Sequence, residues 1–418
     1  MDIGRAIVDR VAELGRHSDS PDHYTRMYLT PAHRAAARRI AQWMEEAGMQ
    51  VHVDAVGSVI GRYEGAAPRG RGTSRHQMTK TLLLGSHFDS VRNGGKYDGV
   101  LGILVPIACV AELARRGERL PVAVQVAAFA DEEGARFHTS FLASRALIGR
   151  FERAALERRD NDGISLADAM ATAGLDPAKV DAARIDPASL AAYVEVHIEQ
   201  GPVLLDGGHA LGVVTSIAAG LRHTVRVKGE AGHAGTVPMP RRRDALAAAA
   251  EMVLAVEKRC GAAGGLVGTV GILRVKNGSS NVIPGEVEFT IDIRAADGET
   301  HLAAQKDVFD ACEAIARRRG VAVEHTKTHE VRAVPCASWL QDAIAASIER
   351  TVGGAAPRLP SGAGHDAMVL AEVTGVGMMF VRCGAGGVSH NPAETVSAGD
   401  AGAAAAALLD LLRNFRPR

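Results

Sequence analysis

The stretch TLLLGSHFDSVRNGGKYDG, residues 81–99, joins an apolar run to a glycine-rich segment with one histidine and two aspartates. Its first residues are typical of a buried strand, and its glycines let the following backbone turn tightly. A second apolar run at 122–130 ends in the acidic triplet at 131–133. Helical patterns over 100–116 and 141–150 alternate with these strands. This order predicts βαβ units around a mixed or parallel sheet.

The pattern changes from about residue 215 onward. A strand, a helix, two strands, a helix and a strand follow one another at 223–229, 241–259, 267–275, 287–294, 300–319 and 321–327. This βαββαβ order is the split arrangement of a ferredoxin-like domain. Helical and strand patterns of α/β type return at 338–351, 375–383 and 400–414. The sequence therefore predicts a larger, mixed-sheet α/β domain formed by 1–214 and 331–418, with a smaller α/β domain inserted at 215–330.

Composition narrows the classes of partner. The 418 residues carry no formal net charge, and the pI is about 7.3. Nucleic-acid and anionic-membrane binders usually show a basic footprint, so we expect neither partner. Small molecules and other protein chains remain as the expected classes of partner. The longest uncharged apolar stretch, 100–111, is too short to span a bilayer, and we expect neither a signal peptide nor a membrane anchor.

The five cysteines are scattered and show no CxxC spacing. This distribution argues against a disulfide framework and against a structural zinc site, and it favours a reducing cytoplasm. The segment GAAPRGRGTSRHQMTK, 65–80, is polar and rich in glycine. We predict a mobile surface loop there.

Polar groups follow two successive predicted strands. In doubly wound sheets, ligands bind beyond the carboxyl ends of the strands. His87, Asp89 and Asp98 follow the first strand, and the acidic residues 131–133 follow the second. Any one of these residues alone is more often a solvated loop residue. Together they would repel one another unless protons or cations neutralise them, so the combination favours a divalent-metal site.

Two further histidines are candidate ligands. The segment YVEVHIEQGP, 193–202, alternates, which places His197 on the polar face of a strand. His390 lies in the polar segment GGVSHNPAE. Each is also plausible as a structural or turn histidine. Because zinc-like ions need about three or four protein ligands, five residues could serve two ions if one carboxylate bridges. These five are His87, Asp98, Glu133, His197 and His390.

Nine motifs support a resemblance over nearly the whole chain. In order they are HFDS, KYDG, FADEEGARF, HIEQGP, GEAGHAGTVPM, SNVIPG, DIR, SGAGHDAM and SHNPAE. They resemble the dinuclear metal amidohydrolases related to the M20 peptidases. More narrowly they are similar to the hydantoinase/carbamoylase branch, which contains N-carbamoyl-L-amino acid hydrolases, β-ureidopropionases and allantoate amidohydrolases. The resemblance implies a metallohydrolase domain, an inserted dimerisation and lid domain, and a homodimer.

The resemblance also implies a ligand set for two divalent ions. It makes Asp98 the bridging ligand, His87 and Glu133 ligands at one flank, and His197 and His390 the ligands that complete the site. Zinc, manganese, cobalt and nickel all accept such mixed imidazole and carboxylate ligands. In the related peptidases an aspartate commonly occupies the position of His197, so HIEQGP favours the amidohydrolase branch.

Other roles come from the same resemblance. Glu132 becomes the general base, and Asp89 orients His87 without binding metal. His233, in the inserted domain, becomes the donor to the oxyanion, and in the family this histidine reaches the active site of the partner subunit. A glycine-flanked histidine is otherwise more often a plain turn residue.

Substrate contacts are implied as well. Arg294 is expected to bind the substrate carboxylate, a task suited to the planar guanidinium. Asn281 and Gln200 are expected to add neutral hydrogen bonds, and His365 is expected to line the pocket. Arginines at strand ends are more often ion-paired surface residues, and a structural role for His365 is nearly as plausible.

The favoured function is a metal-dependent amidohydrolase that converts an N-carbamoyl amino acid to the amino acid, carbon dioxide and ammonia. Allantoate and β-ureidopropionate are alternative substrates, because each has a ureido group near a carboxylate. A peptidase or aminoacylase is less favoured because of His197. A catalytically silent binding protein conflicts with the retention of Glu132 beside every expected ligand. A scaffold protein predicts no bound metal.

Overall fold

The computed structural model describes residues 2–66, 80–262 and 264–417. The chain divides into two compact units. Unit 1 comprises Met1–Thr215, Cys336–Leu359 and His365–Arg418, and unit 2 comprises Ser216–Pro335 and Pro360–Gly364. The sequence-based bounds of the inserted domain are 215–330. Within the predicted surface loop, 67–79 lie outside the described residues.

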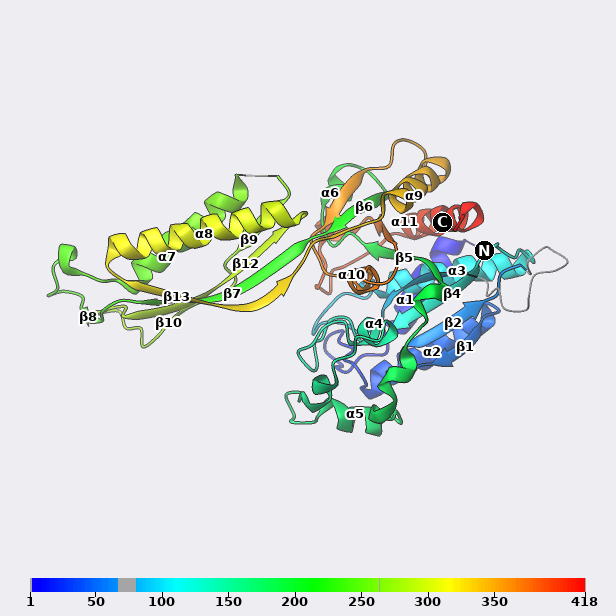
Figure 1. Ribbon diagram of the computed structural model, residues 1–418, viewed down its shortest axis with the longest axis horizontal. Helices are drawn as coiled ribbons and strands as arrows, with labels where there is room; N and C mark the ends of the chain where they lie inside the picture. Colours follow the sequence, from blue (N-terminus) through cyan, green and yellow to red (C-terminus); the bar gives the residue numbers. More distant parts are fainter. Residues whose placement is uncertain (1, 67–79, 263, 418) are drawn as a thin grey trace. The chain divides into compact units, whose positions relative to one another are not determined.

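The larger sheet has nine strands and mixed directions (Figure 1). In spatial order these are β1 (Gln50–Val53), β2 (Val59–Tyr63), β4 (Ala123–Phe129), β3 (Thr81–His87), β5 (Leu190–Ile198), β16 (Val376–Val381), β6 (Leu211–Ile217) and β14 (Val334–Pro335), with β15 (Arg358–Ser361) paired to β6. The four central strands, β4, β3, β5 and β16, run parallel. Their carboxyl ends therefore meet at one edge of the sheet.

The central strands are buried on both faces. Every residue of β3 and β4 is buried, as expected of parallel strands that helices cover on each side. The helices of unit 1 are α1 (Ile3–Leu14), α2 (Pro31–Glu46), α3 (Val100–Arg115), α4 (Leu142–Leu147), α5 (Leu166–Thr172), α6 (Val203–Asp206), α9 (Ser338–Thr351), α10 (Asp366–Leu370) and α11 (Ala398–Asn414). Helix α3 packs on β3 and β5 and against α1 and α11, so it is apolar around most of its circumference. The predicted α/β fold with a mixed sheet is confirmed.

Unit 2 is built on a five-stranded antiparallel sheet in the order β10-β12-β7-β13, with β9 also paired to β12. Its elements are β7 (Ala219–Lys228), β8 (Gly232–His233), α7 (Ala245–Gly261), β9 (Leu266–Thr269), β10 (Leu273–Val275), β11 (Val282–Ile283), β12 (Glu286–Ala295), α8 (Gly298–Arg319) and β13 (Ala322–Val331). The element order agrees with the predicted βαββαβ arrangement. The small strands β8 and β11 form a separate pair.

One predicted strand of unit 2 is wrong in detail. The run 267–275, expected as a single strand, forms β9 and β10, which both pair with β12. Thr269 lies opposite Asp292 and Leu273 opposite Phe289, so four steps along one chain face three along β12. The extra residue interrupts the ladder in the manner of a bulge.

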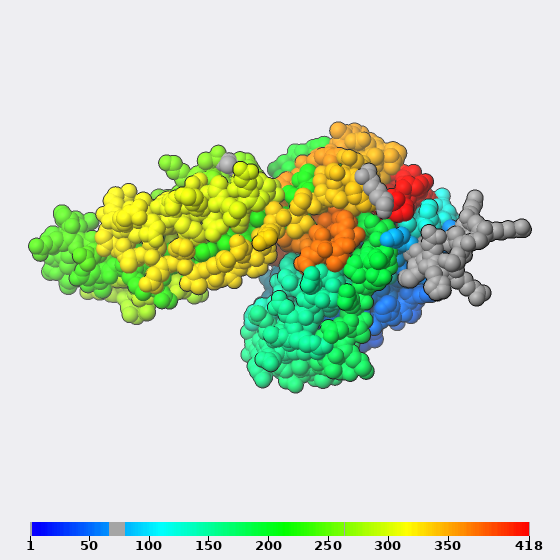
Figure 2. Space-filling view, viewed as in Figure 1, coloured from blue at the N-terminus to red at the C-terminus, as the bar shows by residue number. Residues whose placement is uncertain are grey.

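The sheet of unit 2 has one apolar face. Along β12 the side chains of Val287, Phe289, Ile291 and Ile293 are buried, while those between them are half-buried. The buried side chains pack in one core with α7 and α8. On the other face charged residues pair across strands, as Arg222 and Asp292 do at 2.9 Å. In Figure 2 the yellow surface of this unit includes α8.

Two compositional expectations can be compared with the structure. None of the helices in the described ranges has both the length and the apolar character needed to cross a bilayer. All five cysteines are buried, free thiols. The expectation that they form no disulfide framework is confirmed.

Candidate metal centre

The candidate ligands of unit 1 lie at the carboxyl ends of the four parallel strands. His87 is the last residue of β3, and His197 lies near the end of β5. Glu133 follows β4, and His390 follows β16. Parallel strands that end at one edge thus bring together residues from segments far apart in the sequence.

Asp98 lies at the centre of this cluster. Its Oδ1 atom is 3.2 Å from His197 Nε2 and 3.6 Å from His87 Nε2, and its Oδ2 atom is 3.1 Å from His390 Nε2. Glu133 Oε1 lies 3.6 Å from the same nitrogen of His390. One carboxylate therefore faces three imidazoles, one oxygen toward each side of the cluster. The structure brings all five predicted ligands together.

The imidazole nitrogens are arranged for cation binding. His197 Nδ1 lies 2.9 Å from the carbonyl oxygen of Ile198, to which it can donate a hydrogen bond. His87 Nδ1 similarly faces the carbonyl oxygen of Asp89 at 3.2 Å. In each neutral ring the Nε2 lone pair then points toward Asp98. His197 Nε2 is buried and has no hydrogen-bond partner among the described residues. These donors fit one or more divalent cations.

Gly99 explains why Asp98 can come this close to His87. Gly99 has a φ of 64° and is the N-cap residue of α3. A Cβ atom there would lie 2.4 Å from the carbonyl oxygen of His87 and 2.5 Å from its ring atom Cδ2. Any other residue would push the Asp98 backbone away from the imidazole.

Asp89 links His87 to the acidic segment after β4. Its Oδ1 accepts a hydrogen bond from the backbone N–H of Glu132 at 3.0 Å, and its Oδ2 accepts one from Glu133 at 3.1 Å. The same Oδ1 lies 3.3 Å from His87 Nδ1. The carboxylate of Asp89 therefore lies beside His87, and its role in orienting that ring stays a prediction.

Glu132 is buried beside the ligands, with 8% of its surface exposed. Burial raises the pKa of its carboxyl well above the ordinary value. The negative charges of Glu133 and Asp366 add to this rise, while His87 opposes it. A carboxylate with a raised pKa is a stronger proton acceptor than an ordinary glutamate.

The pKa values of Asp98, Glu133 and His390 are also shifted by burial and by the charges of their neighbours. Burial alone would raise the pKa of Asp98, but contacts with three histidines hold it well below the usual value. Burial raises the pKa of Glu133 to about 7. The contact with Asp98 raises the pKa of His390 to about 9. A cation that binds here must therefore displace protons from the imidazoles.

Glu195 lies on β5, two residues before His197, and the sequence analysis assigns it no role. It is fully buried, and its Oε1 accepts a hydrogen bond from Ser86 Oγ at 2.7 Å. Its Oε2 accepts hydrogen bonds from Tyr193 Oη at 3.2 Å and from the backbone N–H of Ala367 at 3.1 Å. One carboxylate thus joins the segments that carry His87, His197 and His365. The only sequence signal is its place on the polar face of 193–199.

Gln200 and His365 are expected to contact the substrate, and in the structure each contacts a candidate metal ligand. Gln200 Nε2 donates a hydrogen bond to Asp98 Oδ2 at 3.0 Å, so the amide contacts a candidate ligand. His365 is 1% exposed, and its ring lies edge-on to that of His197 at 4.4 Å. Burial, followed by the charge of His197, lowers the pKa of His365 well below its usual value. The predicted substrate contacts of both residues remain predictions.

Two predicted substrate-binding residues of unit 2, His233 and Asn281, form hydrogen bonds with nearby backbone groups. His233 is exposed on β8, and its Nδ1 accepts a hydrogen bond from the backbone N–H of Gly235 at 3.0 Å. A neutral ring then carries its proton on Nε2. Asn281 is also exposed, and its backbone carbonyl oxygen accepts a hydrogen bond from Ala234 N–H at 2.9 Å. These contacts place His233 and Asn281 on neighbouring segments.

Arg294 lies at the end of β12. Its Nε and Nη2 atoms contact the two carboxylate oxygens of Asp292, each at 3.1 Å. Its Nη1 donates a hydrogen bond to the carbonyl oxygen of Gly362 at 2.8 Å. About a third of the side chain is exposed. The guanidinium is therefore oriented within unit 2 and still accessible.

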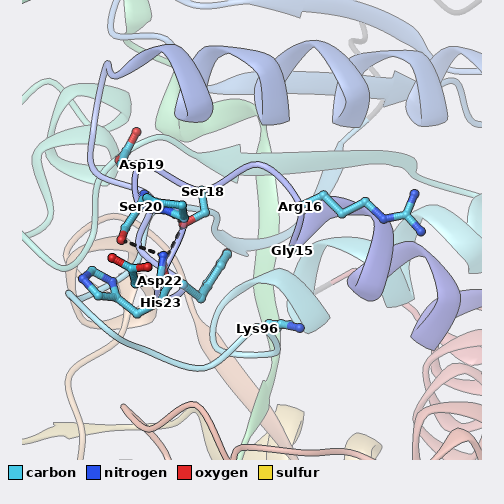
Figure 3. A pocket seen from close by; sticks show the side chains of 10 residues that line it. Gly15, Arg16, Ser18, Asp19, Ser20, Asp22, His23 and Lys96 are labelled. Atoms are coloured by element: carbon cyan, nitrogen blue, oxygen red, sulfur yellow. Dashed lines mark hydrogen bonds between the residues drawn. The ribbon is translucent and has the colours of Figure 1, made fainter.

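A surface hollow of about 700 Å³ lies elsewhere in unit 1 and is lined by residues of 15–24 and Lys96 (Figure 3). Several of its polar groups are hydrogen-bonded within the loop. Ser18 Oγ donates to the carbonyl oxygen of His23 at 2.9 Å and accepts from Ser20 N–H at 3.2 Å. Asp22 N–H donates to Ser20 Oγ in turn. We assign no ligand to this hollow.

Comparison with known proteins identifies the family. The profile of peptidase family M20/M25/M40 matches residues 83–414, a range that includes all five candidate ligands. The chain belongs to this family. It is 41% identical to N-carbamoyl-L-amino acid amidohydrolase of Geobacillus stearothermophilus, over 94% of this chain and 93% of the relative. It is 40% identical to allantoate deiminase of Arabidopsis thaliana, over 97% of this chain and 81% of the relative.

Solved structures place this M20 protein within a branch of the family. A hydantoinase/carbamoylase family amidase from Burkholderia ambifaria superposes with a TM-score of 0.87 and 34% identity, covering 98% of this chain and 96% of that one. The protein is therefore a metal-dependent amidohydrolase of the hydantoinase/carbamoylase branch, as the motifs indicate.

Proposed function

We propose that this amidohydrolase cleaves the ureido C–N bond of N-carbamoyl-L-amino acids. The observation that carries the proposal is the convergence of three imidazoles on Asp98 beside the buried Glu132. The substrate class is supported by the N-carbamoyl-L-amino acid amidohydrolase at 41% identity. Allantoate is the second candidate, because allantoate deiminase is 40% identical. Both substrates combine a ureido group with a carboxylate, and β-ureidopropionate shares this chemistry.

Two divalent cations would be held by the five clustered residues, with Asp98 shared between them. The ligand atoms of His87, Asp98 and His197 lie within 4.8 Å of one another, as do those of Asp98, Glu133 and His390. Zinc, manganese, cobalt and nickel all suit these ligands. When bound, such cations polarise a carbonyl group and lower the pKa of water toward about 7.

Glu132 moves the proton in this proposal. Its carboxylate accepts a proton from the attacking water and returns it to the departing nitrogen. One C–O bond forms and one C–N bond breaks, which releases one nitrogen product and leaves the other as a carbamate. The second C–N bond breaks when this carbamate decomposes, its proton passing to the nitrogen, so the final products are the amino acid, carbon dioxide and ammonia. The raised pKa of Glu132 supports this role, because a proton on it is stable enough to be carried between the two steps.

Residues of unit 2 would bind and orient the substrate. His233 Nε2–H would donate a hydrogen bond to the developing oxyanion, which its Nδ1 contact with Gly235 supports. Arg294 would bind the substrate carboxylate through its guanidinium. Asn281 of unit 2, with Gln200 and His365 of unit 1, would add the remaining contacts.

We further propose a homodimer formed through unit 2, with His233 acting in the partner subunit's site and unit 2 acting as a lid. Support comes from β13, which lies at the edge of its sheet with most of its residues exposed. Such an edge can pair with a strand of another chain. The five buried thiols support a reducing compartment such as the cytoplasm.

The experiment is a parallel assay of metal-depleted protein. Manganese or zinc is added back, and ammonia release is measured from N-carbamoyl-L-amino acids, N-carbamoyl-β-alanine and allantoate. We expect metal-dependent release, with the largest kcat/KM for an N-carbamoyl-L-amino acid. A larger value for allantoate would transfer the assignment to that substrate. Hydrolysis of dipeptides without ammonia release from any of the three would contradict the ureido proposal.

A further inference from the structure

Glu394 is a buried carboxylate that neither the ligand set nor the proposed proton transfer uses. It ends the motif SHNPAE and is 3% exposed. Its Oε1 accepts hydrogen bonds from the backbone N–H groups of Tyr97 at 2.8 Å and Asp98 at 3.1 Å. Its Oε2 accepts a hydrogen bond from Ser389 Oγ at 2.7 Å. Both oxygens are therefore occupied.

These contacts connect two segments almost 300 residues apart, one carrying Asp98 and the other His390. Ser389, which precedes His390, also places its Oγ 3.4 Å from Asp98 Oδ2. Gly95 completes the fit, because a Cβ atom there would lie 2.1 Å from the carboxyl carbon of Glu394. The carboxylate thus fills the space between the two segments.

A carboxylate is an unusual choice for this position. Removing a charge from water is costly. Glu394 is 3% exposed, and the three donors that it accepts from, two backbone N–H groups and a hydroxyl, carry no charge. Three donors must be satisfied, and a carboxylate offers acceptors on both oxygens, whereas an amide offers only one acceptor atom. Its negative charge beside Asp98 is best tolerated when a cation is bound there.

We propose that Glu394 is a positioning residue that holds Asp98 and His390 in the arrangement that binds divalent cations and so increases cation affinity. It acts through the backbone of Asp98 and the side chain of Ser389, and it touches neither the cation nor the substrate. This inference rests on the ligand set proposed above. It adds Glu394 as a residue that fixes the positions of two of those ligands, Asp98 and His390.

The test measures cation binding directly. Metal-depleted wild type and Glu394→Gln are titrated with Zn²⁺ in competition with a chromogenic chelator, and the visible spectrum of the Co²⁺ form reports the ligand geometry. We expect affinity to fall by about 10- to 100-fold, as is typical when a residue that orients metal ligands is changed. We also expect an altered Co²⁺ spectrum and a kcat that saturating metal only partly restores.

Two further variants test the same contacts from other directions. Ser389→Ala removes only the hydroxyl that joins Glu394 to the His390 segment, so we expect a smaller loss of affinity. Gly95→Ala introduces a methyl group against the Glu394 carboxyl, so we expect a loss at least as large as that of Ser389→Ala. If Glu394→Gln does not fold, Ser389→Ala still tests the proposal.

Asp54→Asn is the matched control. Asp54 is a buried carboxylate of unit 1 whose Oδ1 accepts hydrogen bonds from the backbone N–H groups of Val56 at 3.0 Å and Ser58 at 2.8 Å. We expect its loss to lower the Tm of the metal-depleted protein without changing cation affinity or the Co²⁺ spectrum. Wild-type affinity and spectrum in Glu394→Gln, with only a lowered Tm, would overturn the proposal for Glu394. Absence of cation binding by wild type would instead overturn the ligand set itself.

Discussion

Most candidate residues of unit 1 are buried, with His390 as the exposed exception, whereas His233 and Arg294 of unit 2 are exposed or partly exposed. In unit 1, His87, Asp98 and His197 are each at most 5% exposed, and the carboxylates around them are hydrogen-bonded to several segments. In unit 2, His233 is exposed and Arg294 is about one-third exposed, and each is fixed by contacts with its close neighbours. Unit 1 thus holds a largely buried candidate cation site, whereas unit 2 presents oriented donors to solvent.

This difference separates two tasks. A buried cluster of carboxylates and imidazoles is costly unless cations or protons neutralise it, so its geometry suits the binding of divalent cations. Exposed donors with a fixed orientation cost little to maintain and can recognise a ligand that arrives later. We therefore expect changes in unit 1 to act on metal binding or proton transfer, and changes in unit 2 to act on substrate binding and turnover with metal retained.

The largest expected effect comes from Glu132→Gln. The amide cannot accept the proton of water, so kcat should fall by about 10³-fold or more. Ammonia release and metal content by elemental analysis check this together. Because Glu132 is not one of the five ligands, metal content should stay at the wild-type level. A variant that loses metal in parallel with activity would make Glu132 a ligand rather than a base.

The second-largest effect is expected from His233→Ala. Its kcat should fall by about 10²- to 10³-fold, the usual cost of removing an oxyanion donor. Metal content should be unchanged because the residue belongs to unit 2. His209→Ala, at an exposed histidine of unit 1, serves as the control and should retain activity. If His233→Ala retained wild-type kcat, the oxyanion role would be wrong.

Arg294→Lys should raise KM by about 10- to 100-fold, the loss expected for a charge-assisted, two-pronged contact. A substrate analogue that lacks the carboxylate should show no such difference between wild type and variant. Arg274→Lys, at an exposed position on β10, controls for a general loss of arginine in unit 2. Equal losses for substrate and analogue would exclude a contact with the carboxylate.

The smallest expected effect, taken over one pH unit, is a gradual dependence of metal affinity on pH. The contact with Asp98 raises the pKa of His390 to about 9, so this imidazole is protonated below that pH when no cation is bound. A cation binds only the deprotonated ring, so affinity should rise with pH, by up to about tenfold per unit for each proton displaced, until pH passes about 9. Calorimetry in buffers of different ionisation enthalpy measures the protons released. Binding without proton release would contradict this charge balance.

The sequence predicts those parts of the molecule that depend on local pattern. Helix α9 has the predicted bounds, and the strand ends that carry His87 and Glu133 follow from apolar runs that stop at polar residues. The alternation of 193–199 places Glu195 and His197 on one face of β5. The run 267–275 was predicted as one strand because its composition does not reveal the extra residue opposite β12.

Long-range contacts could not be predicted in this way. The hydrogen bonds of Glu195 to Ser86 and of Glu394 to Tyr97 join residues 109 and 297 positions apart. No local periodicity records which strands will become neighbours. The ring orientation of His233 is also invisible in sequence, because it depends on a backbone N–H that the loop turns toward Nδ1. These features require the folded chain.

The close approach of Gly99 to His87 also bears on engineering. Even a methyl side chain at position 99 would clash with the imidazole of His87. Most variants in a mutagenesis library that randomises position 99 would therefore be inactive. Protein engineering for activity on new ureido compounds should keep Gly99 and vary the exposed neighbours of Arg294 and Asn281 instead.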